Sequence, residues 1–385
     1  MSDRTLPTVI VLGTTQTLAW ASSYYLAAVL GDVIARDTGV STQWFFAAFS
    51  ASLLISAFLG PQVGRRIDAV GGRGVLAISN VTFAIGLVLL ALAKGPVLLG
   101  LAWLALGLGM SMGLYDAAFA TLGRIYGTNA RKPITGITLI AGFASTVGWP
   151  LTAWGMATLG WRETCLAWAA VHVVFGLPMN LFLLPRPRIT ATDGKTQDQP
   201  VPIDRTLVLL ATAFALSWVV TAGMAAHFPR ILEAAGASPA AAIAASALIG
   251  PAQVAARIFE ASVLARFHPL VSARLATITH PLGALVVAFA GGGFIAGAFA
   301  ILHGLGNGII TIARGTVPLA LFGPQSYGYR LGIIGAPARI LQAGAPLLFA
   351  FLIERYGAGV LVFSTALMLG ALVALLLVRI PKPAA

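Results

Sequence analysis

The chain contains about twelve apolar segments that follow one another with only short polar breaks. An α-helix needs about 20 consecutive apolar residues to cross the hydrocarbon core of a bilayer. A chain of 385 residues therefore has room for roughly a dozen such helices. The strands of a membrane β-barrel would instead show alternating segments of about ten residues, whereas these segments are continuous. The pattern predicts an all-α membrane protein with about 12 transmembrane helices.

The composition supports this fold class. Hydrophobic residues make up 58% of the chain and charged residues only 9%, with a mean hydropathy of +0.90. Soluble domains carry about 25% charged residues. Most of the surface is therefore expected to face something other than water.

The predicted helices fall into two groups of six. A stretch with four prolines and many polar residues, 185–204, separates them and reads as a cytoplasmic linker. We predict an N-terminal six-helix bundle over 1–184 and a C-terminal six-helix bundle over 205–385. The expected helices cover approximately residues 8–34, 42–64, 74–93, 97–126, 134–158, 164–184, 205–232, 239–265, 274–290, 294–322, 329–353 and 357–380.

The placement of positive charge predicts the orientation. The net charge is +12, which could also indicate nucleic-acid binding. If the amino end is cytoplasmic, however, 17 of the 24 lysines and arginines lie on the cytoplasmic side and 5 on the far side, with Arg314 and Arg339 inside helices. This is the positive-inside bias of membrane proteins. We expect a multi-pass protein of the inner (cytoplasmic) membrane, with both termini cytoplasmic and no nucleic-acid partner.

The chain lacks the motifs of an enzyme, a metal site or a cofactor site. Its single cysteine, Cys165, excludes a disulfide framework. No Walker loop, HExxH motif or pair of histidines occurs, and His172, His280 and His303 are scattered without metal-ligand spacing. We therefore expect no cofactor, no metal, no catalytic residues and no ATP-driven pump.

One polar stretch indicates a family. The stretch Phe58–Gly74 joins the second and third apolar segments with a short loop, and its pattern Gly64-x-x-x-Asp68-x-x-Gly71-x-Arg73 resembles motif A of major facilitator superfamily (MFS) transporters. Gly160-Trp161-Arg162, before the sixth segment, fits the same family. The resemblance covers essentially the whole chain. It implies the MFS fold, with two pseudo-symmetric six-helix bundles, alternating access, a substrate site near the midplane between the halves and a monomer.

The resemblance also implies a gate. In the family, the aspartate that matches Asp68 helps to close the cytoplasmic side against the start of the eleventh helix. We extend this gating role to Asp68, Arg73 and Arg66. Arg257 and Glu260, one helical turn apart near the inner edge of the eighth helix, are interpreted as an ion pair on the same side.

Three ionisable residues are predicted deep in the membrane. A charge at the bilayer centre costs a few kcal/mol or more unless it is paired or faces water. Arg339 lies about ten residues into the eleventh helix, roughly 15 Å from its end. Arg314 and Asp116 lie at similar depths in the tenth and fourth helices. Two arginines suit a carboxylate substrate, and Asp116 is the candidate proton carrier. The alternative is that Asp116 and one arginine form a purely structural pair.

Other polar residues are candidate substrate ligands. Gln253 and Gln342 lie at apparent mid-depth, and Tyr24 and Tyr25 lie in the outer half of the first helix, where they either line the cavity or pack at the interface. Gly250-Pro251 is expected to break the eighth helix near the middle of the membrane.

The preferred hypothesis is a secondary active transporter that moves a small organic anion, such as a monocarboxylate, by symport with protons. The alternative is an MFS efflux permease for amphipathic or toxic compounds. It is less favoured because Gly148-Trp149-Pro150 matches the antiporter motif of the family only loosely. A membrane enzyme is disfavoured by the missing motifs. The expected partners are an anionic small molecule, the proton and the lipid bilayer.

Overall fold

A computed structural model describes residues 5–185, 201–289 and 293–380. These residues are predominantly helical and include no strand, which confirms the predicted all-α class. Ten helical stretches are long and apolar enough to cross a membrane. Two of them, Pro96–Thr158 and Tyr327–Leu377, have 63 and 51 residues and are each long enough for two crossings. The described helices can therefore accommodate the twelve expected spans.

The chain forms two compact units. Unit 1 comprises Met1–Val201 with Gly323–Ala336, and unit 2 comprises Pro202–Phe322 with Pro337–Ala385. The helix α16 (Tyr327–Tyr356) therefore begins in unit 1 and ends in unit 2. Most of the predicted linker, 186–200, lies outside the described residues.

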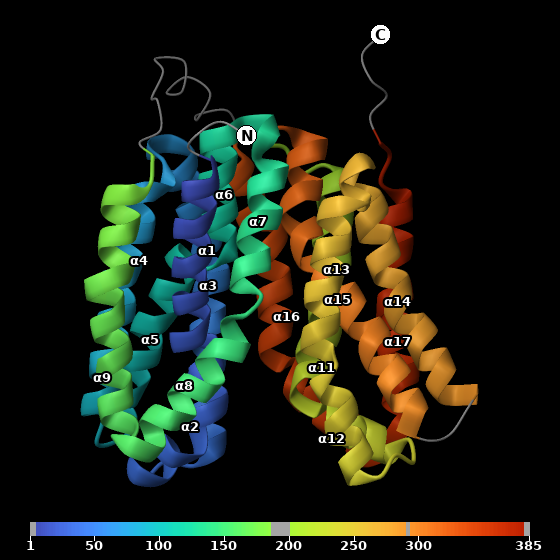
Figure 1. Cartoon of the computed structure of the whole chain (residues 1–385), viewed down its shortest axis with the longest axis horizontal. Helices are drawn as coiled ribbons and strands as arrows, with labels where there is room; N and C mark the ends of the chain where they lie inside the picture. Colours follow the sequence, from blue (N-terminus) through green and yellow to red (C-terminus); the bar gives the residue numbers. More distant parts are fainter. Residues whose placement is uncertain (1–4, 186–200, 290–292, 381–385) are drawn as a thin grey trace. The chain divides into compact units, whose positions relative to one another are not determined.

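Unit 1 contains most of the first six predicted spans (Figure 1). Besides the start of α16, its helices are α1 (Thr5–Ser22), α2 (Tyr24–Asp37), α3 (Thr42–Val70), α4 (Gly72–Leu92), α5 (Pro96–Gly113), α6 (Tyr115–Tyr126), the 3-10 helix η1 (Gly127–Ala130), α7 (Arg131–Ala141), α8 (Ala144–Thr158), α9 (Trp161–Val171) and the π-helical segments η2 (His172–Gly176) and η3 (Met179–Leu183).

Unit 2 contains the remaining spans. Besides the end of α16, its helices are α11 (Arg205–Ala234), α12 (Pro239–Ala247), α13 (Ile249–Ser262), the 3-10 helix η4 (Leu264–Arg266), α14 (Pro269–Phe289), α15 (Gly293–Phe322), the 3-10 helix η5 (Gly357–Gly359) and α17 (Val360–Leu377).

Four predicted spans are broken helices. The first is interrupted at Ser23, the fourth at Leu114, the fifth between α7 and α8, and the eighth at Leu248. The break expected at Gly250-Pro251 is thus found slightly earlier, at Leu248. Pro251 lies in the first turn of α13, where a missing N–H costs nothing because that group has no intrahelical partner.

The loop predicted between the second and third helices, 65–73, is wrong in its extent. Helix α3 continues through the motif to Val70, and Gly71 alone separates it from α4. Gly71 has φ 84°, a conformation that glycine adopts without the steric cost of a side chain. Arg65, Arg66 and Asp68 are therefore fixed on the last two turns of α3, whereas Arg73 lies in the first turn of α4.

Small residues let the helices approach closely in both units. A Cβ atom on Gly107 of α5 would lie 2.7 Å from the carbonyl oxygen of Ser52 on α3, and one on Gly304 of α15 would lie 2.8 Å from that of Ile249 on α13. The second and fourth spans of each group of six thus pack backbone to backbone (Figure 1). This is how helix interfaces are built in lipid, where apolar bulk offers no advantage over the acyl chains.

Candidate functional site

The motif residue Asp68 binds the first turn of α16 within unit 1. Its Oδ1 accepts the backbone N–H of Gly328 and its Oδ2 that of Tyr329, each at 2.8 Å. The first N–H groups of a helix lack intrahelical partners and carry partial positive charge. The α3 carboxylate therefore caps the first turn of a helix in which Gly328 lies 260 residues later in the chain.

Glycines bring the two backbones together beside this carboxylate. A Cβ atom on Gly64 would overlap the backbone of Gly328, and one on Gly332 would lie 2.5 Å from the Cα atom of Pro61. The guanidinium of Arg65 lies 4.3 Å from the ring centroid of Tyr329. Sequence reasoning missed Arg65.

The other predicted gating arginines are placed differently. Arg66 is exposed near the end of α3, and Arg73 is half-buried in the first turn of α4. Arg257 and Glu260 of α13 are both buried in unit 2, at 5% and 1% exposure. The Nε and Nη1 atoms of Arg257 have no hydrogen-bond partner among the residues that the structure describes.

The two predicted intramembrane arginines are buried in unit 2. Arg314 of α15 and Arg339 of α16 are each 7% exposed. The guanidinium carbon of Arg314 lies 5.3 Å from the ring centroid of Trp218 on α11, a cation–π arrangement. Gln342 is half-buried one turn after Arg339, and Gln253 is half-buried on α13.

Asp116 occupies the corresponding place in unit 1. It is 6% exposed and lies in the first turn of α6, directly after the break at Leu114. A carboxylate is favoured there because a helix N-terminus is electropositive. Trp20 precedes Trp218 by 198 residues, and Asp116 precedes Arg314 by the same number. The two units thus carry opposite charges at matching positions relative to a tryptophan.

Tyr24 and Tyr25 belong to an aromatic cluster in unit 1. Their ring centroids lie 5.5 and 6.0 Å from that of Trp20, which also packs 5.3 Å from Tyr115. Both tyrosines are half-buried, and Tyr25 also contacts Trp149 at 5.7 Å. The cluster surrounds the breaks at Ser23 and Leu114, so these rings line the part of unit 1 that contains Asp116.

Two buried histidine networks correct the sequence-based view that the histidines are scattered and unpaired. In unit 1, His172 contacts Ser22 Oγ through Nε2 at 2.7 Å and Asn80 Oδ1 through Nδ1 at 2.8 Å. In unit 2, the Nδ1 atoms of His280 and His303 are 3.1 Å apart. The histidines lie on different helices, so no spacing along the chain reveals these contacts.

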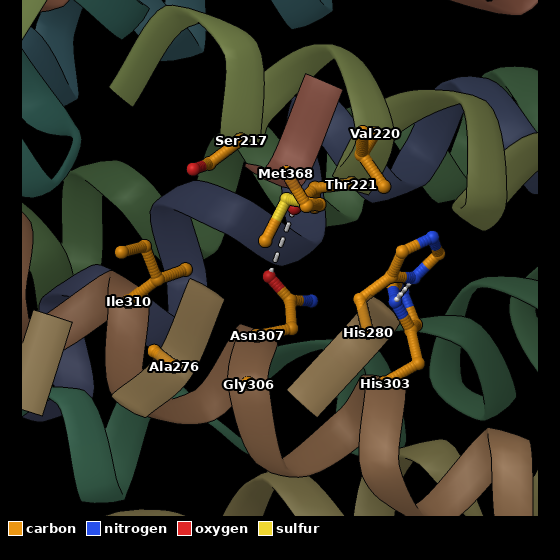
Figure 2. Close-up of a pocket in the computed structure, with 10 residues that line it drawn as sticks. All are labelled: Ser217, Val220, Thr221, Ala276, His280, His303, Gly306, Asn307, Ile310 and Met368. Carbon is orange, nitrogen blue, oxygen red and sulfur yellow. Dashed lines mark hydrogen bonds between the residues drawn. The ribbon is translucent and has the colours of Figure 1, made fainter. Parts of the chain in front are cut away.

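The histidine pair of unit 2 lines a small cavity (Figure 2). Beside it, Thr221 Oγ1 donates a hydrogen bond to Asn307 Oδ1 at 3.2 Å. About 10 Å³ is open to the centre of a water molecule, which is room for about one water. The cavity is therefore too small to be the site of an organic substrate. Among the described residues, no group of three or more histidine, cysteine, aspartate or glutamate side chains could hold a metal ion.

Comparisons with known proteins agree on the fold. The family model described as "Major Facilitator Superfamily" matches residues 12–336. An uncharacterised 38 kDa protein in the 23S RNA operon of Thermoproteus tenax is 28% identical over 348 residues, which cover 84% of this chain and 88% of that protein.

Two solved structures are similar over nearly the full length. The human organic anion transporter MFSD10 (TETRAN) superposes with a TM-score of 0.74 at 15% identity, covering 97% of this chain and 100% of that one. The proton:xylose symporter XylE, bound to 6-bromo-6-deoxy-D-glucose, gives a TM-score of 0.75 at 13% identity, covering 97% and 95%. At these identities, the similarity concerns the fold and not the substrate.

Proposed function

This chain belongs to the major facilitator superfamily, and we propose that it is a secondary active transporter that moves a small organic anion, such as a monocarboxylate, together with protons by alternating access. It is a multi-pass membrane transporter and not an enzyme. The proposal adds the chemical class of the substrate and the coupling ion.

The burial of Arg314 and Arg339 is the observation that carries the anion proposal. Each side chain is 7% exposed on a helix of a membrane-spanning unit. Guanidinium stays protonated in proteins, so burial cannot be relieved by losing the charge. A carboxylate that binds the fork of guanidinium N–H groups offsets the desolvation and gains directional hydrogen bonds. Gln342 and Gln253, with Tyr24 and Tyr25 in unit 1, are proposed to complete the substrate contacts.

Asp116 is the proposed proton carrier. A buried carboxyl group can exchange a proton when its surroundings change, and its burial at 6% exposure separates it from bulk water. It lies in the first turn of α6, directly after the helix break at Leu114, so a movement around that break would change its surroundings.

The contact of Asp68 with α16 is the proposed cytoplasmic gate. Helix α16 continues from unit 1 into unit 2. If Asp68 released the first turn of α16, that turn could move together with the rest of the helix in unit 2. Four further residues are proposed to contribute charge on the same side: Arg73, Arg66, Arg257 and Glu260. The proposed location is the inner membrane with both termini cytoplasmic, which reporter fusions at each end would test.

Uptake of radiolabelled lactate, pyruvate and benzoate into proteoliposomes tests the anion proposal. We expect saturable uptake that Arg339→Gln reduces by about tenfold or more, since loss of a charged hydrogen-bond partner costs about 1.5–3 kcal/mol. Arg355→Gln is the matched control, because Arg355 lies exposed in the last turn of the same helix. Saturable transport of a neutral or cationic compound that Arg339→Gln leaves unchanged would refute the proposal.

Efflux of amphipathic compounds is the second candidate. The observation in its favour is the aromatic cluster of Trp20, Tyr24 and Tyr25, since rings of this kind bind apolar ligands without requiring charge. A resistance screen in cells with and without the protein separates the two functions. Broad resistance that survives Arg339→Gln would favour efflux.

A further inference from the structure

The histidine pair of unit 2 lies at one end of a hydrogen-bond chain between helices. His280 on α14 contacts His303 on α15 through the two Nδ1 atoms at 3.1 Å, and its Nε2 lies 2.9 Å from Ser364 Oγ on α17. Ser364 Oγ in turn donates to the carbonyl oxygen of Leu361 at 3.1 Å. Figure 2 shows the two imidazoles side by side at the edge of the cavity, opposite Thr221 and Asn307.

One arrangement of hydrogens uses all three contacts. The Ser364 hydroxyl donates to Leu361, so His280 Nε2 carries a hydrogen and donates it to Ser364. A neutral imidazole has one donor and one acceptor nitrogen. His280 Nδ1 is then the acceptor, and His303 Nδ1 carries the hydrogen of the shared bond.

This arrangement leaves one basic atom unused. His303 Nε2 keeps its lone pair and has no hydrogen-bond partner among the described residues. The His303 side chain is 6% exposed and lines the cavity. Buried polar atoms are usually satisfied, so a lone pair at a cavity large enough for about one water indicates a site for a small donor.

His172 in unit 1 shows the contrasting case. It is fully buried and contacts neutral groups through both nitrogens, Ser22 at Nε2 and Asn80 at Nδ1. Both of its nitrogens face side chains of the protein, so it reads as a structural crosslink between the first, third and sixth spans.

Apart from the two histidines, no described residue that lines the cavity can titrate. The ten residues that line it come from α11, α14, α15 and α17, and only the two histidines among them can titrate. The other titratable or charged residues of these helices are Arg205, His227, Arg230 and Glu233 on α11, Arg274 on α14 and Arg314 on α15, while α17 has none. The Arg274 guanidinium donates to the carbonyl oxygens of Leu375 and Val378.

We propose that the His280–His303 pair is a binding site for one proton, which His303 Nε2 takes up from a hydronium ion that reaches the cavity. The proton forms an N–H bond at Nε2, and the hydronium ion that supplies it returns to water. His303 then becomes an imidazolium that donates to His280 Nδ1 and to the water molecule in the cavity. A role of this site in coupling rests on the proposed proton symport.

Nitrogen NMR of ¹⁵N-histidine-labelled protein in nanodiscs, recorded from about pH 8 down to the lowest pH at which the protein stays folded, tests the site. In the wild type we expect the ring nitrogens of His303 to move to imidazolium shifts as the pH falls. His303→Gln should lose one titrating imidazole. His172 should stay neutral throughout and serves as the internal control.

A His303 signal that stays neutral wherever the protein remains folded would overturn the proposal. So would a titration unchanged by His303→Gln. If that variant does not fold, Ser364→Ala keeps both histidines but removes the acceptor for His280 Nε2–H, and we expect it to shift the midpoint of the same titration. A titration midpoint that Ser364→Ala leaves unshifted would argue against the hydrogen-bond chain from His303 through His280 to Ser364. The titration needs no substrate, so failure of lactate uptake would refute the anion proposal and leave this result standing.

Discussion

Asp68 and Tyr329 are joined by a hydrogen bond of 2.8 Å between a helix-borne carboxylate and a backbone N–H in the first turn of another helix. The neighbouring Gly328 donates to the second carboxylate oxygen at the same distance. Both oxygens thus accept orphan N–H groups at the positive end of α16. The contact depends on charge and on the absence of side chains at Gly64 and Gly332, so both can be tested.

Asp68→Asn should loosen the first turn of α16. The amide oxygen can accept only one of the two N–H groups well, and the charge is lost. Hydrogen bonds to charged groups contribute about 1.5–3 kcal/mol, so the amides of Gly328 and Tyr329 should exchange with deuterium about tenfold faster or more.

Hydrogen–deuterium exchange of the wild type and the variant measures this effect. Arg66→Gln is the control, since it changes an exposed charge of the same motif, and we expect no change in these amides. Equal exchange in Asp68→Asn and the wild type would contradict the capping role.

The overall fold was largely predictable because lipid imposes a simple rule: long apolar segments must be helices. The helix breaks were not. Ser23 and Leu114 are not residues that end helices by themselves, and their conformations depend on packing within unit 1. The loop predicted over 65–73 was wrong because Arg65 and Arg66 are good helix formers, and the positive φ of Gly71 alone provides the turn.

The candidate site, like the fold, could be predicted only in part from the sequence. Burial of Arg314, Arg339 and Asp116 follows from their depth in apolar segments. The partners do not follow, because the two histidines of the pair, 23 residues apart, lie on different helices. Each buried histidine in an apolar segment does signal a partner, since a polar group in a dry interior is costly unless hydrogen-bonded.

Gly332→Ala should disrupt the packing of α16 on α3. The added Cβ would lie 2.5 Å from both the Cα and the nitrogen of Pro61. Backbone atoms cannot move aside easily, and overpacking costs about 1–3 kcal/mol. We expect a lower Tm in detergent and slower transport. Gly344→Ala is the control on the same helix, because nothing lies within 4 Å of a Cβ atom there; an equal effect of both substitutions would indicate that helix propensity, not packing, is responsible.

Asn80→Ala should destabilise unit 1. The Asn80 Oδ1 atom accepts from His172 Nδ1, and its Nδ2 donates to the carbonyl oxygen of Leu76 at 2.8 Å. Truncation leaves the buried imidazole N–H without an acceptor, which costs about 1–3 kcal/mol. Thermal unfolding monitored by fluorescence measures the loss. Thr82→Ala, which removes an exposed hydroxyl from the same helix, should change the Tm little, and a similar fall in both variants would argue against the network.

Asp116→Asn separates proton coupling from substrate binding. If Asp116 carries the proton, the variant cannot take it up, so accumulation of lactate driven by a pH gradient should fall by about tenfold or more, whereas exchange of labelled for unlabelled lactate across the membrane should continue. The reason is that exchange needs only a bound substrate, and asparagine mimics the neutral carboxyl at the start of α6.

If Asp116 is instead a structural partner of a buried arginine, removing its charge leaves a buried cation uncompensated, and breaking such a pair costs about 3–5 kcal/mol. Loss of both exchange and accumulation, accompanied by a lower Tm, would identify that structural role and refute the assignment of Asp116 as the proton carrier.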